Sequence, residues 1–154
     1  MWSLLKGGKH AGTSLPQILF LDPDYFFWSF EKKVFRGRLA EEAAELNWKA
    51  RHIKIPKPDP ENWCVEYIFS PENKFSWYRL IDPERGLHIG SSITRRSTHI
   101  DMSVVRDACR YDKGGYKRFI KHMKRDLFGN SAIKMTVARC EEFFDDGDNF
   151  GSGI

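Results

Sequence analysis

Residues 94–125 carry ten basic side chains and only three carboxylates, which is the strongest chemical signal in the sequence. Apolar residues recur at helical spacing from Tyr116 to Leu127, so we expect a helix whose other face carries cations. A row of cations can neutralise the phosphates of a nucleic acid and release their counterions. An ordinary solvated helix face has the same pattern. The candidate binding residues here are Arg95, Arg96, Lys113, Lys117, Arg118, Lys121, Lys124 and Arg125.

A glycine turn near the N-terminus carries two more candidate cations, Lys9 and His10. Gly8 and Gly12 flank them and permit the positive φ angles of a tight turn. The turn has too few cations to hold a phosphate alone, so its binding role depends on the later basic helix. Asp22 then precedes a proline and an aromatic run, and predicts the N-cap of a helix.

The N-terminal residues also resemble a known family. The similar residues are Gly8-Lys9-His10-x-Gly12, Leu15-Pro16-Gln17-Ile18 and Asp22-Pro23-x-Tyr25-x-x-Trp28. They resemble the small module found at the C-terminus of exodeoxyribonuclease-X-like proteins and in the related quorum-sensing-regulated virulence factor family. The resemblance covers about the first 30 residues, with Gly7 where the family usually has Phe and Ala11 where it usually has Lys. It implies an accessory module of nucleic-acid enzymes and carries over no catalytic residue.

Two other functions have some support in the sequence. Asp59, Glu72 and Lys74 resemble the metal-binding carboxylates and lysine of Mg²⁺-dependent restriction nucleases, although Pro71 and Asn73 place Glu72 in a turn. A protein-interaction or inhibitor module could instead act through exposed aromatics or an acidic C-terminal end. That acidic end consists of Glu141, Glu142, Asp145, Asp146 and Asp148.

We therefore predict a protein of bacterial or phage type that binds nucleic acid or assists a nucleic-acid enzyme. The sequence favours a non-enzyme over an enzyme, with no cofactor and no metal. Its partner would be DNA, RNA or an enzyme that acts on them. Three cysteines, Cys64, Cys109 and Cys140, have no metal-binding spacing and predict reduced thiols in the cytoplasm. No apolar run reaches the length of a membrane span, so we expect no membrane partner.

The chain has 154 residues, 41% of them hydrophobic, which fits one folded domain. Helices are predicted over residues 14–21, 23–35 and 39–51, with Glu42 on the outer face of the third. Proline-rich residues 54–60 predict an extended connector between a helical part, 1–53, and a second part, 61–154. Gly37 would end the second helix.

After the connector the apolar period changes to two and predicts a β-hairpin over residues 63–69 and 75–80. Its aromatics could stack unpaired bases, but core packing is the better interpretation. Residues 87–93 predict a third strand, and residues 116–127 predict a helix. Residues 101–109 predict a short helix, although Val104 and Val105 also fit a strand. A last helix would begin near Thr136, followed by a frayed tail from Gly147. The fold class is therefore α+β, with C-terminal helices packed on a small antiparallel sheet.

Overall fold

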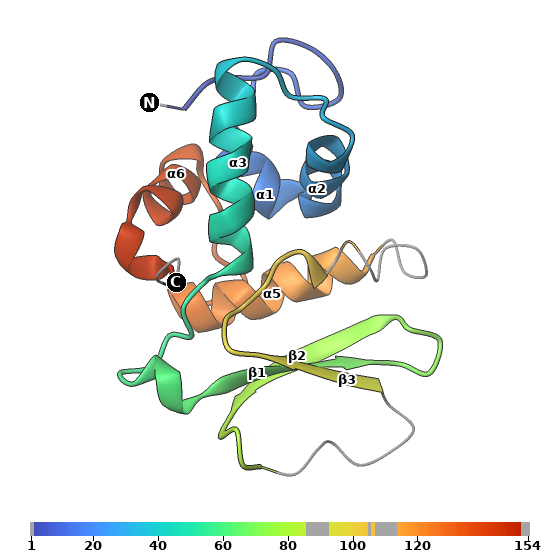
Figure 1. Cartoon of the computed structure of the whole chain (residues 1–154), viewed down its shortest axis with the longest axis vertical. Coiled ribbons are helices and arrows are strands. Elements are labelled where there is room, and N and C mark those ends of the chain that lie inside the picture. Colours follow the sequence, from blue (N-terminus) through green and yellow to red (C-terminus); the bar gives the residue numbers. More distant parts are fainter. Residues whose placement is uncertain (1, 86–92, 105, 107–113, 152–154) are drawn as a thin grey trace.

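The computed structural model describes residues 2–85, 93–104, 106 and 114–151. This part of the chain has the predicted α+β fold, with an antiparallel sheet, a helix packed on the sheet and a cluster of other helices (Figure 1). Helix α5, Gly115–Phe128, runs between the sheet and a cluster of further helices (Figure 1). The helices of this cluster are α1 (Leu15–Leu21), α2 (Pro23–Glu31), α3 (Arg38–Arg51) and α6 (Val137–Asp145). One continuous set of buried apolar residues extends from Leu5 to Phe150 and includes residues of both the sheet and the helices.

The first two helices begin where their capping residues predict. In α1, Leu15–Leu21, the backbone N–H of Ser14 donates to Gln17 Oε1 over 3.1 Å. In α2, Pro23–Glu31, Asp22 accepts from the backbone N–H of Tyr25. Both helices direct apolar residues into the core, since Ile18 and Phe26 have no exposed surface, while Leu21 and Trp28 stay exposed.

Helix α2 is four residues shorter than predicted, because Lys33 takes a left-handed conformation with φ of 56°. The Val34 N–H bonds to the Ser29 carbonyl and the Lys33 N–H to the Phe30 carbonyl, as at helix ends that normally need glycine. Gly37 lies at the N-cap of α3, Arg38–Arg51, and does not end α2.

The outward position predicted for Glu42 is wrong. Glu42 is only 8% exposed, because its carboxylate accepts hydrogen bonds from the backbone N–H and the hydroxyl of Ser3. Arg38 lies 3.4 Å from the same carboxylate. Glu42 therefore holds the N-terminal segment against α3.

The segment after α3 joins the two parts of the molecule. Ile53 forms antiparallel bridges with both Ile100 and Phe150 and is completely buried. The Lys54 N–H donates to the Asn149 carbonyl on the C-terminal side. The predicted frayed tail is therefore wrong up to Gly151: a 3₁₀ turn η2, Gly147–Asn149, leads into the buried Phe150. Another 3₁₀ turn, η1, Pro60–Asn62, leads into the sheet.

The sheet contains β1, Cys64–Phe69, between β2, Phe75–Ile81, and β3, Ile93–Ser97, with antiparallel pairing on both sides. The hairpin has the predicted bounds to within a residue. The described strand β3 begins at Ile93, the last residue of the predicted range, and residues 87–92 of that range lie outside the described part. Every residue of β1 is buried, as expected for a central strand.

The C-terminal helices agree with their sequence signals. Gly129 ends α5 with φ of 77°, and Thr136 caps α6, Val137–Asp145, by accepting from the Arg139 N–H. Most of the helix predicted over residues 101–109 lies outside the described residues. In the described part, no helix combines the length and apolar composition needed to cross a membrane.

Candidate nucleic-acid interface

Helix α5 uses two of its faces for packing and leaves a third to solvent. Phe119 packs against the rings of Phe75 and Tyr78 on the sheet side. Ile120 and Met123 belong to the core shared with the helix cluster. The remaining face carries four predicted binding residues, which we call the basic stripe: Lys117, Lys121, Lys124 and Arg125.

The basic stripe is accessible along its length. Lys117 and Lys121 are exposed and Lys124 is half-buried. The Arg125 side chain is 53% exposed and its Nε lies 3.3 Å from Asp126 Oδ1, on the neighbouring residue. At about 1.5 Å per residue, the stripe is roughly 12 Å long. One strand of a duplex has a phosphate about every 3.4 Å along the helix axis, so the stripe matches the axial span of three or four phosphates.

Arg118 lies on the same helix but has a structural role. Its Nε and Nη2 donate to the Phe75 carbonyl over 3.0 and 2.9 Å. These bonds join α5 to the first residue of β2. Arg118 is an exposed residue, so it borders the stripe while it holds the helix on the sheet.

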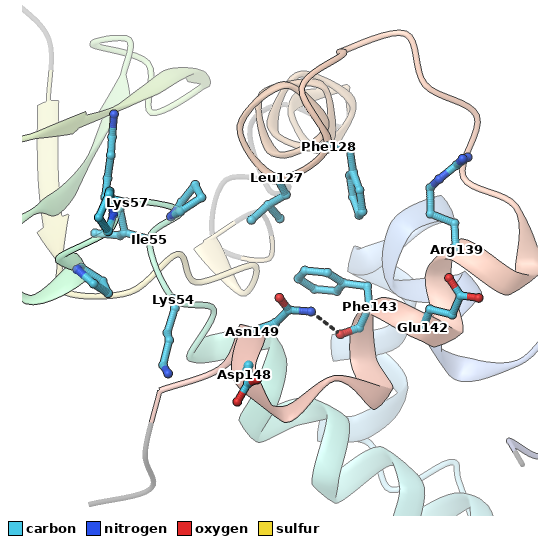
Figure 2. A pocket seen from close by; sticks show the side chains of 13 residues that line it. Lys54, Ile55, Lys57, Leu127, Phe128, Arg139, Glu142, Phe143, Asp148 and Asn149 are labelled. Carbon is cyan, nitrogen blue, oxygen red and sulfur yellow. Dashed lines mark hydrogen bonds between the residues drawn. The ribbon is translucent and has the colours of Figure 1, made fainter.

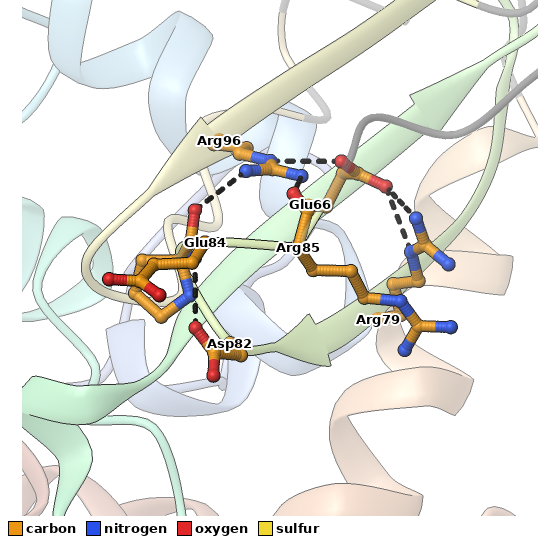
Figure 3. Close-up of polar contacts among 7 residues, drawn as sticks. Glu66, Arg79, Asp82, Glu84, Arg85 and Arg96 are labelled. Atoms are coloured by element: carbon orange, nitrogen blue, oxygen red, sulfur yellow. Dashed lines mark hydrogen bonds and ion pairs between the residues drawn. The ribbon is translucent and has the colours of Figure 1, made fainter.

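Arg96 belongs to a buried ion cluster on the opposite face of the sheet (Figure 3). Glu66 has no exposed surface, and its two carboxylate oxygens pair with Arg96 Nε at 2.9 Å and Arg79 Nη2 at 2.7 Å. Burial favours a raised pKa for Glu66, but hydrogen bonds from Arg96 and Arg79 bring the pKa below its ordinary value. Arg96 also donates to the carbonyls of Pro83 and Arg85, so it is occupied by structural contacts.

The other two predicted basic residues outside the glycine turn are Arg95 and Lys113. The Arg95 guanidinium lies over the Phe69 ring, 5.1 Å from its centroid, at an exposed position of the edge strand β3. Lys113 lies outside the described residues. The structure therefore places Arg95 and Arg96 on the sheet, and the basic stripe on a different element.

Both cations of the glycine turn contact Asp22. Lys9 Nζ and His10 Nε2 lie 3.1 and 3.0 Å from Asp22 Oδ2. The hydrogen bond to Asp22 raises the pKa of Lys9, and the nearby Tyr116 of α5 contributes a smaller effect in the same direction. Burial opposes ionisation of Asp22, yet hydrogen bonds from His10 and Lys9 lower its pKa overall. The turn is thus close to the start of α5, but an internal carboxylate already balances its charge.

The predicted nuclease site is not assembled, because Asp59 and the Glu72–Lys74 pair lie at opposite ends of β1. Asp59 precedes β1 and accepts from Asn62 Nδ2 and Trp63 Nε1. Glu72 and Lys74 lie in the turn after β1. A six-residue strand separates the two positions by roughly 20 Å, so they cannot share a metal ion. Within the described ranges, no three His, Cys, Asp or Glu side chains form a group that could hold a metal.

The acidic C-terminal residues take part in local contacts. Glu141 accepts from the Ser14 hydroxyl, and Asp145 accepts from Trp2 Nε1 over 2.9 Å. Asp146 caps η2 through the Asp148 N–H. These side chains therefore hold the N-terminal segment and the tail in place.

The hairpin aromatics pack mostly into the core, as the sequence favoured. Tyr67, Phe69, Phe75 and Tyr78 are at most 2% exposed, so they cannot stack on bases. Trp77 is half-buried, and the guanidinium carbon of Arg79 lies over its ring, 5.9 Å from the centroid.

No family model, curated protein or solved structure matches this chain. The resemblance of the first 30 or so residues to the exodeoxyribonuclease-X-like module therefore stays a prediction, and function has to be argued from the geometry of the molecule.

Two structural roles, those of Glu66 and of Asp22 as an ion-pair partner, were missed in the sequence. The hairpin turn, with Phe69 opposite Phe75, is centred on Glu72, and this symmetry alone would place Glu66 opposite Tyr78. A register shift between Ile68 and Phe69 places Glu66 opposite Arg79 instead, and no sequence signal indicates that shift. Asp22 was correctly predicted as an N-cap, but its distance of 13 residues from Lys9 gave no indication of their ion pair.

Proposed function

We propose that this protein binds nucleic acid through phosphate contacts along the basic stripe of α5. The observation that supports the proposal best is the position of Lys117, Lys121 and Lys124 on the single solvent-facing side of a helix fixed on two sides. Other candidate cations, such as Arg96 and His10, contact internal carboxylates. A rigid row of cations suits sequence-independent binding, because phosphate contacts carry no base information.

The proposed partner is DNA or RNA, bound directly or beside an enzyme that acts on it, and the protein would have no chemistry of its own. Burial raises the pKa of the Cys140 thiol to about 11 and also raises that of Cys64. Such thiols are poor nucleophiles, in keeping with a binding protein of a reducing compartment such as the cytoplasm.

The test is a salt titration of binding to a labelled 20-base-pair duplex, followed by fluorescence anisotropy. We expect log Kd to rise linearly with log salt concentration. Changing Lys117→Gln and Lys121→Gln together should weaken binding and reduce the slope by about 2, since each phosphate contact contributes about 0.9.

The matched control removes two cations from the exposed connection between α2 and α3, by Lys32→Gln and Arg36→Gln. This control lowers the net charge by the same two units as the Lys117→Gln and Lys121→Gln pair, and it should leave the salt slope of binding nearly unchanged. Equal effects of the two double variants would mean that only net charge matters, and a wild-type protein that does not bind would refute the proposal.

A further inference from the structure

A cavity of about 600 Å³ lies at the C-terminal end of α5. Its walls are the connector 54–60, the end of α5, and α6 with the tail that follows it (Figure 2). The volume is in the range of small-molecule sites, and the three prolines of the connector give one wall a rigid backbone.

Aromatic rings form the inner part of the cavity. Phe128, the last residue of α5, is half-buried and packs edge to face on Phe143, with 5.8 Å between ring centroids. Figure 2 shows both rings and Leu127 along the same wall. A planar base can stack on such a partly exposed ring whatever its sequence.

The rest of the lining is polar and carries more positive than negative groups. Lys54, Lys57 and Arg139 outnumber the two carboxylates, Glu142 and Asp148. Figure 2 shows the lysines on the connector and Arg139 across the cavity from them. The Lys57 ammonium lies over the Trp63 ring, 4.5 Å from its centroid, and Arg139 Nη1 donates to the Lys134 carbonyl, so we assign the anionic part of a ligand to Lys54. This lining suits a ligand that has a flat apolar part and a negative charge beside it.

Asn149 provides a hydrogen-bond acceptor in the lining. Its Nδ2 donates to the Phe143 carbonyl over 2.9 Å, which fixes the amide. Its Oδ1 is then the end of the amide directed toward Leu127 (Figure 2). A carbonyl oxygen held in this way can accept from the N–H groups on the edge of a base.

The cavity continues the basic stripe. Lys117, Lys121 and Lys124 precede Phe128 by eleven, seven and four residues, so all four side chains lie on one face of α5. A strand whose phosphates follow the stripe would bring its next nucleotide to the Phe128 ring.

We propose that this cavity binds one unpaired nucleotide, with the base against Phe128 and a phosphate near Lys54. The inference rests on the proposed function and narrows it: the protein binds single strands or frayed ends more tightly than blunt duplexes. A duplex keeps its bases stacked and paired, so it can use the stripe but not the cavity.

The experiment compares the affinities of a 15-nucleotide single strand, as DNA and as RNA, and of a blunt 15-base-pair duplex. Phe128→Leu removes the aromatic face and keeps an apolar side chain in the core. We expect about tenfold weaker binding of single strands and less than twofold change for the duplex, because losing one stacked base costs about that factor. The Lys117→Gln and Lys121→Gln pair should weaken both.

Two further variants keep the result interpretable. Phe30→Leu alters another half-buried phenylalanine, in α2 and away from the cavity, and should change neither affinity. Lys54→Gln alters the opposite wall without removing a core side chain and should weaken only single-strand binding. Equal losses for both ligands, or none, would overturn the cavity proposal and leave the stripe intact. Absence of binding to every ligand would overturn the proposed function as well.

Discussion

Asp22 illustrates how one residue decides the function of a whole turn. Its Oδ1 caps α2 through the Tyr25 N–H, and its Oδ2 accepts from Lys9 and His10. The sequence pattern of the glycine turn indicated an anion site, but these two cations already have an anionic partner. The turn can bind a phosphate only in competition with this carboxylate.

The substitution Asp22→Asn tests that competition. Asparagine is as good an N-cap as aspartate, so α2 should keep its start, while Lys9 loses its anionic partner. The pKa of Lys9 would fall toward its ordinary value, which still leaves it charged at pH 7. We expect several-fold tighter duplex binding at low salt and a salt slope steeper by about 1, measured by anisotropy.

The control for this prediction is Glu41→Gln, an equal charge change at an exposed position of α3. If both variants tighten binding to the same extent, the gain comes from net charge and the turn does not contact the ligand.

At the scale of elements, Glu66 joins the three strands of the sheet. Its side chain lies on β1, and its partners Arg79 and Arg96 lie on β2 and β3, directly opposite it in the register (Figure 3). A three-stranded sheet has few ladder hydrogen bonds, so a buried charge with two cationic partners contributes strongly to its pairing. Removing one member of such a cluster leaves the others without compensation.

We predict that Glu66→Gln lowers the free energy of unfolding by about 3 kcal/mol at pH 7, measured by urea denaturation. The folded-state pKa of Glu66 is lowered, so its stabilising effect is present above the unfolded value of about 4.3 and lost as the pH falls through the folded value. The difference between wild type and variant should therefore shrink in acid.

Glu72→Gln is the control, because Glu72 is exposed in the hairpin turn. It should leave stability within about 0.5 kcal/mol of wild type. A difference between wild type and Glu66→Gln that stays constant from pH 7 to pH 3 would contradict the assigned role of the carboxylate.

The elements also show what a sequence can and cannot provide. Helix starts at Ser14, Asp22 and Thr136 were predictable because capping acts within one turn of chain. The end of α2 was not, since Lys33 takes a conformation that sequence rules reserve for glycine. The exposed basic stripe followed from periodicity, whereas the cavity combines segments near residues 54, 128 and 143, whose proximity depends on tertiary packing.

At the scale of the whole molecule, the segment around Ile53 links the helix cluster to the sheet. Ile53 pairs with Ile100, which follows β3, and with Phe150 at the end of the described tail. The Gly151 N–H donates to the His52 carbonyl next to it. The predicted boundary between the two parts of the chain is thus hydrogen-bonded both to the segment after β3 and to the C-terminal tail, which favours a single cooperative domain.

We predict that Ile53→Ala lowers the free energy of unfolding by about 3 kcal/mol, from lost burial and the cavity that remains. If the chain is one domain, helical circular dichroism and intrinsic fluorescence should still give coincident urea transitions, both shifted to lower urea. Fluorescence reports both parts, since Trp2, Trp28 and Trp48 lie on the helix side and Trp63 and Trp77 on the sheet side, whereas the helical signal comes mainly from the cluster and α5. Independent unfolding of the two parts would therefore add a fluorescence transition that the helical signal lacks. Val34→Ala, at a 45% exposed position, should shift neither curve appreciably. Separate transitions for the two signals, in wild type or variant, would show that the sheet and the helix cluster unfold independently and that the single-domain prediction is wrong.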